Sequence, residues 1–258
     1  MKILALDTAT ENCSAALVLD ADRRFREIEM ERGHAERILP MIDELLAEAG
    51  IGLSELDAIA FGRGPGSFTG VRLAATVTQG LAFGAGLGVI PISDLQAVAQ
   101  RAFRIHQKPT RILVCNDARM SEVYWACFER GHDGLARRVG EEHVGKPSDV
   151  RLPSGWSTAE AAGRGFAAYA EALLGAVPTV TYGTDLLAAT GANQLESQES
   201  QRTECSVPLT QLLPHALDIA LLAVPQVAAG GLLPPEAATP VYLRDNVAHV
   251  AQAPKRPT

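Results

Sequence analysis

The sequence has few cysteines and histidines, and none of them are paired in a motif. The four cysteines lack Cys-x-x-Cys spacing, and the six histidines form no His-x-x-x-His pair. This argues against a helical metal site and favours reduced thiols, as in a cytoplasmic protein. An uncharged apolar run of about 18 residues is also lacking, so no membrane span is predicted.

An excess of positive charge is lacking as well. The 258 residues include 23 Lys and Arg against 30 Asp and Glu, a net charge of −7, which argues against a broad basic surface for nucleic acid. A local contact would depend on Arg23, Arg24 and Arg26 or on Lys255–Arg256, and basic clusters this small are usually only solvated. With 47% apolar and 21% charged residues, the composition is that of one large globular domain or two small ones.

In the N-terminal half, apolar periodicity and turn residues predict the order β-β-β-α-β-α-β-α. The three leading strands are joined by short links and are expected to be antiparallel. Pro40 predicts a kink or a late start in the first helix, and Asp94 is expected to cap the third helix. The predicted elements are the strands Ile3–Thr8, Cys13–Asp20, Phe25–Glu31, Leu56–Gly62 and Leu87–Ile92 and the helices Ala35–Ala49, Phe68–Phe83 and 94–104.

The C-terminal half begins after a predicted boundary at Gln107–Thr110. In its last helix, Pro214 is expected to delay the start and Pro225 to bring an early end. The polar segment Gly183–Ser206 is interpreted as a loop or insertion, and Ala251–Thr258 as a frayed tail. The predicted elements are the strands Arg111–Asp117, Glu122–Arg130 and Thr179–Tyr182 and the helix Pro208–Val227.

The segment Ala60–Gly70 places four glycines between an apolar strand and a helix. Such a loop can direct N–H groups toward an anion beside a helix N-terminus. Its spacing matches neither the P-loop nor the dinucleotide-binding fingerprint. The alternative is a tight turn in which the glycines allow close packing, and Ser67 is expected as the N-cap of the following helix.

Five motifs occur in one order along the chain and together carry a resemblance. They are Ile3–Thr10, His34–Glu36 with Leu39–Pro40, Gly62–Arg72, Asp117–Tyr124 and Val241–Arg244. In this set the chain resembles the bacterial TsaB (YeaZ) family, whose members help to make threonylcarbamoyladenosine in tRNA. The resemblance is dense over residues 1–130, thin over 131–207, and returns near the C-terminus.

The resemblance implies an α/β fold of the ASKHA (actin, hexokinase and Hsp70) type with two related lobes. The expected lobes are residues 1–107 and 108–258, with the helix at about 208–228 packing back on the first lobe. Asp7 and Thr8 are then expected to face nucleotide phosphates, with Gly64, Gly66 and Ser67 as further weak candidates. No cofactor is expected to be required by the chain alone, and ATP or ADP is expected only in the assembled complex.

The catalytic relative in the same pathway, TsaD, carries a metal-binding His-x-x-x-His after a short apolar strand. The corresponding stretch here, Val89–Val98, contains no histidine, because none lies between His34 and His106. Neither a metal site nor a catalytic residue is therefore expected. Cys115 is expected to be an inert core thiol, and Asp117 to make an Asx-type hydrogen bond beside a salt bridge from Arg119.

The two helices Ala35–Ala49 and Phe68–Phe83 are candidates for a partner surface. The first carries apolar residues on more than one face, and the second has small residues at close-approach spacing. In the family these helices pair with the equivalent helices of TsaD, and the same surface self-pairs as a homodimer when the protein is alone; the alternative is that both helices are simply buried. The expected interface residues are His34, Ile38, Met41, Ile42, Leu45, Gly70, Ala74, Ala75 and Thr78.

Three functions follow as hypotheses. The first is a non-catalytic scaffold that binds TsaD, helps to recruit the ATPase TsaE, and reaches tRNA only through the complex. The second is a small-molecule kinase or ATPase that uses Asp7 and the loop Gly62–Gly70. The third and weakest is a protease-like activity, which lacks a recognisable nucleophile elbow.

Overall fold

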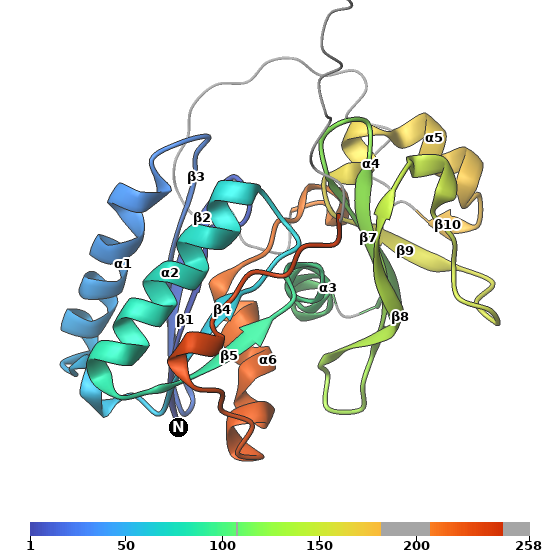
Figure 1. Cartoon of the computed structure of the whole chain (residues 1–258). Helices are drawn as coiled ribbons and strands as arrows, with labels where there is room; N and C mark the ends of the chain where they lie inside the picture. The colour runs from blue at the N-terminus through green and yellow to red at the C-terminus, as the bar shows by residue number, and fades with distance from the viewer. Residues whose placement is uncertain (107, 182–206, 245–258) are drawn as a thin grey trace, which may run out of the picture.

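The computed structural model describes residues 1–106, 108–181 and 207–244, which form two α/β lobes that lie side by side (Figure 1). The segment Gly183–Ser206 and the tail Ala251–Thr258, for which a loop and frayed end were predicted, lie outside the described residues. Among the described residues, no helix combines the length and apolar character needed to cross a bilayer.

The first lobe is built on a five-stranded sheet with strand order β3-β2-β1-β4-β5. Strands β1, β2 and β3 are antiparallel, as their short links predicted, whereas β1, β4 and β5 are parallel. The strands are β1 (Lys2–Asp7), β2 (Asn12–Leu19), β3 (Asp22–Glu29), β4 (Ala58–Gly62) and β5 (Gly88–Ile92).

Helices cover both faces of this sheet (Figure 1). Side chains alternate along β1, so that Leu4 and Leu6 pack against α1 (His34–Ala49) and α2 (Phe68–Ala85) on one face. Ile3 and Ala5 pack on the other face against α3 (Asp94–Ile105) and α6 (Ala216–Ala228).

The second lobe repeats the strand arrangement of the first. Its sheet has the order β10-β9-β6-β7-β8, with β6 antiparallel to β7 and parallel to β9, just as β1 lies between β2 and β4. This repeated topology is the two-lobed ASKHA architecture that the resemblance implied. The elements are β6 (Arg111–Asp117), β7 (Val123–Arg130), β8 (Ala136–Gly145), β9 (Ala159–Ala162), α4 (Gly165–Ala168), α5 (Ala170–Ala176) and β10 (Val180–Thr181), and short 3-10 turns lie at Leu53–Glu55, Pro147–Asp149, Leu209–Gln211 and Pro235–Ala237.

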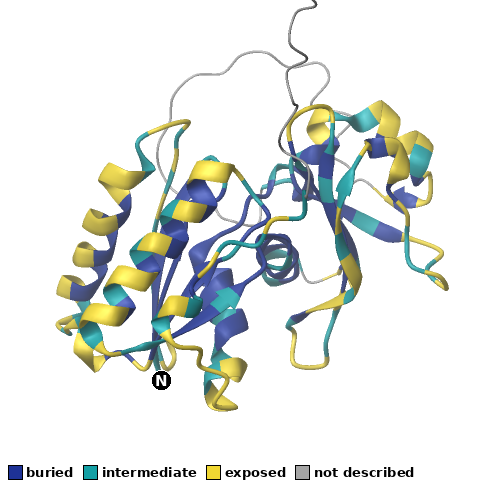
Figure 2. Ribbon diagram, viewed as in Figure 1, coloured by how far each residue is buried: buried dark blue, intermediate teal, exposed yellow. Residues whose placement is uncertain are grey.

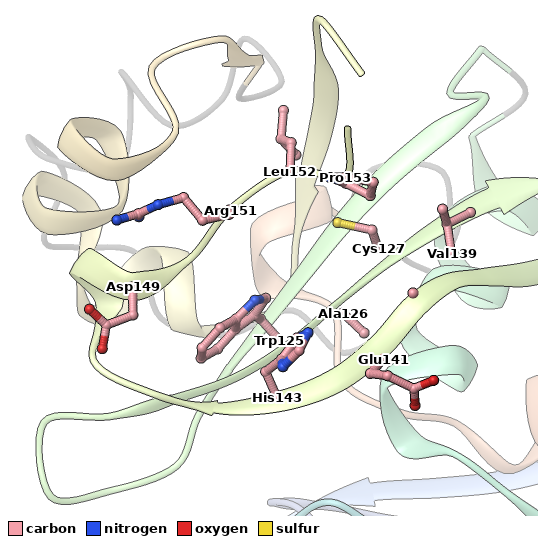
Figure 3. Close-up of a pocket in the computed structure, with 11 residues that line it drawn as sticks. Trp125, Ala126, Cys127, Val139, Glu141, His143, Asp149, Arg151, Leu152 and Pro153 are labelled. Atoms are coloured by element: carbon pink, nitrogen blue, oxygen red, sulfur yellow. The ribbon is translucent and has the colours of Figure 1, made fainter. Parts of the chain in front are cut away.

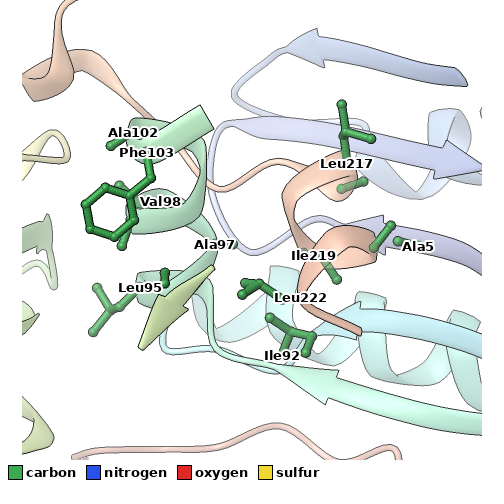
Figure 4. Close-up of a cluster of buried hydrophobic side chains, with 14 of the residues drawn as sticks. Ala5, Ile92, Leu95, Ala97, Val98, Ala102, Phe103, Leu217, Ile219 and Leu222 are labelled. Atoms are coloured by element: carbon green, nitrogen blue, oxygen red, sulfur yellow. The ribbon is translucent and has the colours of Figure 1, made fainter. Parts of the chain in front are cut away.

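A single apolar cluster joins the two lobes through α3 and α6 (Figure 4). It combines Ile92, Val98 and Phe103 with Leu222 of α6 and with side chains of β6 and β7. A hydrogen bond from a side chain extends the junction: the Asn12 side-chain amide donates to the Pro214 carbonyl over 2.9 Å. Helix α6 therefore follows the second lobe in sequence but packs on the first-lobe sheet.

The late start that was one alternative for Pro40 is wrong, and so is the early end predicted at Pro225. Helix α1 begins at His34, well before Pro40, and α6 continues through Pro225 to Ala228. Both prolines are exposed, so water can reach the carbonyl that each leaves without its usual donor. The delayed start of α6 after Pro214 is confirmed.

Candidate functional site

The parallel strands of the first sheet end at one edge, where the chain turns into the glycine loop 62–67 and into α3. Asp7 is the last residue of β1, Gly62 is the last residue of β4, and β5 leads through Ser93 to Asp94. Neighbouring parallel strands end side by side. In open α/β sheets, this carboxyl edge is where ligand sites form.

The carboxyl groups of Asp7 and Asp94 meet at this edge, and both residues are 0% exposed. The Ala9 amide donates to Asp7 Oδ1 over 3.0 Å, and the Gly64 amide donates to Asp94 Oδ2. Asp7 Oδ2 and Asp94 Oδ1 accept no backbone or side-chain N–H. Burial raises the pKa of Asp94 well above its ordinary value of 3.8, and the Asp7 charge raises it further. Burial also raises the pKa of Asp7.

Gly62 is required by this carboxyl pair. A Cβ atom at position 62 would overlap the Oδ1 atoms of both Asp7 and Asp94. The glycine at the end of β4 thus makes room for two acids, which is a packing role rather than a phosphate-binding one.

Polar groups of the glycine loop and of the start of α2 form hydrogen bonds with the residues that follow β1. The Ser67 amide donates to the Ala9 carbonyl over 2.7 Å, and the Thr8 hydroxyl donates to the Gly70 carbonyl over 2.7 Å. A Cβ at Gly66 would lie 2.6 Å from the Ala9 carbonyl oxygen. These contacts favour the tight-turn interpretation. Nucleotide binding through Asp7, Thr8, Gly64, Gly66 and Ser67 stays a prediction.

The predicted N-cap of α2 is confirmed, whereas that of α3 is wrong. Ser67 Oγ accepts the Gly70 N–H over 3.1 Å. For α3 the cap is Ser93, whose Oγ accepts the Gln96 N–H over 3.2 Å, and Asp94 instead directs its carboxyl group to Gly64. Serine and aspartate are both preferred caps, so local preference could not choose between them. The signal that was missed is the pair of acids at one sheet edge.

Among the described residues, this edge brings together fewer than three side chains that could hold a metal. Val98, one turn after Asp94, is 0% exposed in the core. Hard divalent cations take six or more oxygen ligands, whereas these two carboxyl groups are enclosed and each already accepts a backbone amide. Within the ranges that the structure describes, His, Cys, Asp and Glu side chains nowhere gather in a group of three or more that could hold a metal.

The residues predicted to form the partner interface lie on the wrong faces of their helices. The prediction is wrong for eight of the nine residues, because they are buried inside the chain and have no surface to offer. His34 is half-buried, and its Nε2 lies 2.8 Å from the Thr10 carbonyl oxygen, the local bond expected as the alternative. The buried residues are Ile38, Met41, Ile42, Leu45, Gly70, Ala74, Ala75 and Thr78.

The opposite faces of α1 and α2 are exposed (Figure 2). Leu39 of α1 is 44% exposed and Phe83 of α2 is 78% exposed. On α2, a Cβ added at Gly80 or Gly84 would have no atom within 4 Å, so the helix surface is open there. This outer face of α1 and α2 combines large apolar side chains with glycines.

The start of α2 carries an exposed aromatic cluster. The Arg72 guanidinium lies 3.3 Å from the centroid of the Phe68 ring, and its Nε donates to Tyr242 Oη over 2.7 Å. Two of the motifs that carry the family resemblance therefore meet on one surface. One is Gly62–Arg72, which leads into α2, and the other is Val241–Arg244.

Ion pairs tie the two lobes together around the sheet edge. Arg63 pairs with Glu142 at 3.1 Å, Arg119 with Glu11 at 3.3 Å, and Arg164 with Glu29 at 2.7 Å. The prediction for Asp117 is confirmed: its carboxylate accepts the Arg119 N–H over 2.8 Å and pairs with the Arg119 guanidinium at 3.1 Å. Glu122 likewise pairs with an arginine, Arg244.

A separate cavity of about 390 Å³ lies on the second lobe beside β7 and β8 (Figure 3). Its wall includes Trp125, which stacks on His143 with ring centroids 5.1 Å apart. Arg151 is engaged by the carbonyls of Ser148 and Val150. Burial raises the pKa of Cys127 to about 12, so its thiol stays protonated and unreactive. The predicted inert thiol Cys115 is likewise buried and free.

Comparison with known proteins gives one consistent result. The family model described as "TsaD: tRNA N6-adenosine threonylcarbamoyltransferase" matches residues 28–252. The tRNA threonylcarbamoyladenosine biosynthesis protein TsaB of Escherichia coli is 38% identical over 253 residues, which cover 96% of each chain. TsaB of Haemophilus influenzae is 46% identical over 66% of this chain and 75% of its own. The structure of YeaZ from Pseudomonas aeruginosa is 40% identical with a TM-score of 0.76, over 94% of this chain and 99% of its own.

Proposed function

The chain belongs to the TsaB (YeaZ) family, and from that premise we propose that it is a non-catalytic subunit of the machinery that makes threonylcarbamoyladenosine in tRNA. Its part in this biosynthesis follows from the family, whose curated members carry that name. The finer proposal is that the chain binds TsaD, helps to recruit the ATPase TsaE, and reaches tRNA in the cytoplasm through the complex.

The observation that carries the non-catalytic role is the Asp7–Asp94 pair. Where an ASKHA enzyme would need side chains open to a cation and a phosphate, this edge has two carboxyl groups that face each other and are 0% exposed. We propose no cofactor for the chain alone, and we expect ATP or ADP to bind only in the assembled complex. Purified chain with Mg-ATP should therefore show no turnover; turnover that disappears in Asp7→Asn would instead favour the kinase or ATPase alternative.

The proposed partner surface is the outer face of α1 and α2. Exposed apolar side chains such as Leu39 and Phe83 gain from being covered, and the open backbone at Gly80 and Gly84 allows another helix to approach closely. A self-complementary patch of this kind also supports a homodimer when TsaD is absent.

A glycine-to-arginine substitution tests this surface without disturbing the core. Gly80 is exposed, and arginine has a better helix propensity than glycine, so Gly80→Arg should keep the fold while its bulk blocks a partner helix. We expect Gly80→Arg to abolish co-purification with TsaD and to shift any homodimer to monomer in size-exclusion chromatography.

Gly175→Arg is the matched control. Gly175 is also an exposed helical glycine with nothing within 4 Å of an added Cβ, but it lies on α5 of the other lobe. It should bind TsaD as the unaltered chain does. Retained TsaD binding in Gly80→Arg would contradict the proposed surface, and loss in both variants would point to a general defect.

A further inference from the structure

Two carboxyl groups enclosed at contact distance cannot both carry a charge. Asp7 and Asp94 are 0% exposed, the Ala9 amide donates to Asp7, and the Gly64 amide donates to Asp94. The remaining oxygens, Asp7 Oδ2 and Asp94 Oδ1, have no N–H donor. A proton on Asp94 allows this acid to donate to the Asp7 carboxylate, so that two like charges no longer face each other.

We propose that Asp7 and Asp94 share one proton, which holds the glycine loop 62–67 against the end of β1 and the start of α3. We call this proton-dependent contact the latch. The loop is held to Asp94 in both directions: the Gly64 amide donates to Asp94 Oδ2, and the Asp94 amide donates to the Gly64 carbonyl over 3.1 Å. Asp94 in turn meets Asp7, because the Oδ1 atoms of both acids lie beside Gly62. The position of the loop therefore depends on the proton between the acids.

The charged groups around the pair do not replace this proton. From α1, His34 favours the charged form of Asp7, and from the loop, Arg63 favours the charged form of Asp94, but both act less than burial does. Arg63 is itself paired with Glu142 of β8. From β2, Cys13 has a pKa raised to about 12, so it adds no charge. On the far side of the loop, Gly64 faces uncharged groups, the Val71 side chain of α2 and the Val241 carbonyl.

The direction of the pH effect follows from the location of the proton. The unfolded chain releases it near the ordinary value of 3.8, whereas the folded chain keeps it to a higher pH. The contribution of this proton to stability is therefore fully present at pH values below 3.8 and is lost as the pH rises through the folded pKa. When the second carboxylate forms, repulsion from Asp7 opposes the contact that positions Gly64, and the loop leading into α2 is released. This latch is independent of whether a partner binds.

The variant Asp94→Asn tests whether the shared proton matters or whether Asp94 is simply a buried acid. Asparagine keeps an oxygen for the Gly64 amide and an N–H for Asp7, but it needs no proton. With the full-length chain, we expect Asp94→Asn to raise the melting temperature at pH 8 by about 3 °C or more, with a smaller gain at pH 5. Asp43→Asn, an exposed acid on α1, should leave the pH dependence unchanged.

A second measurement does not depend on any variant folding. Isotope-edited infrared spectra of the unaltered chain, recorded as the pH is raised, should contain the carbonyl band of one aspartic acid that stays protonated after the exposed acids have ionised. The proposal is overturned if no such band persists after the exposed acids have ionised. It is also overturned if Asp94→Asn folds but melts with the same pH dependence as the unaltered chain.

Discussion

At the scale of single residues, His215 sets the response of the protein to acid. It is 0% exposed at the start of α6, and its Nδ1 accepts the Leu217 N–H over 2.9 Å. Burial lowers the pKa of His215 well below 6.5, and the charges of Arg101 and Arg104 lower it further. The folded chain thus holds a neutral imidazole where the unfolded chain holds a proton at acid pH.

The contribution of His215 to the free energy of unfolding should therefore fall as the pH drops below about 6.5, by about 1.4 kcal/mol per pH unit until the folded pKa is reached. His215→Asn keeps a capping side chain but cannot titrate. Its free energy of unfolding, measured with urea, should lose most of this acid dependence, whereas His132→Asn in an exposed loop should retain it. An unchanged acid slope in His215→Asn would contradict the assignment.

Asp218 illustrates how burial decides the strength of an ion pair. Its carboxylate is 0% exposed and accepts two bonds from the Arg104 guanidinium, at 2.9 and 3.0 Å. Asp218→Ala should lower the free energy of unfolding by about 3 kcal/mol or more, because a guanidinium stays inside without its carboxylate. Glu44→Ala, which breaks an exposed pair with Arg26, should change it by less than about 1 kcal/mol. Equal effects in denaturant titrations would contradict this account.

At the scale of elements, the sequence predicts helices better than it predicts their exposed faces. Apolar spacing located α1 and α2 within two residues of their observed bounds. It did not identify which side packs on the sheet, because α1 has the exposed apolar Leu39 beside its buried row and α2 has small residues all round. The choice of face is made by tertiary packing, which has no local signal. Local patterns also did not predict two strands of the second sheet. These are β8, which has a run of charged residues, and the short β9.

The two faces of α2 should respond oppositely to arginine. Ala75 is 3% exposed among Leu and Phe side chains of the core, so Ala75→Arg would bury a charge and should unfold the chain or lower its stability by several kcal/mol. Gly80→Arg on the exposed face should leave the melting temperature unchanged or raise it slightly. Thermal melts of the two variants distinguish the faces, and a stable Ala75→Arg would mean that the observed helix orientation is wrong.

At the scale of the whole molecule, the shared core makes the two lobes one cooperative unit. The cluster around α3 includes side chains of both sheets and of α6, and Phe103 within it is 2% exposed. We expect one calorimetric transition for the chain. Phe103→Ala should shift that transition as a whole, with a loss of about 3–5 kcal/mol. Two separate peaks, only one of which moves, would contradict the shared core.

The candidate site also belongs to this scale, because it exists only where strands distant in sequence end together. The sequence showed that the paired histidines of a metal site are missing, and it singled out Asp7 and Asp94 one at a time. It could not show that they meet, since 86 intervening residues separate them and the parallel order β1-β4-β5 brings them to one edge. Long-range register of this kind is set by the whole fold.

The most direct test of the account is a crystal of the chain grown with Mn²⁺ and examined by anomalous diffraction. We predict no anomalous peak between Asp7 and Asp94, with their carboxyl groups in direct hydrogen-bond contact. A manganese peak coordinated by both carboxylates would show that the edge kept a cation site, and it would contradict the conclusion that a proton and a partner surface have taken its place.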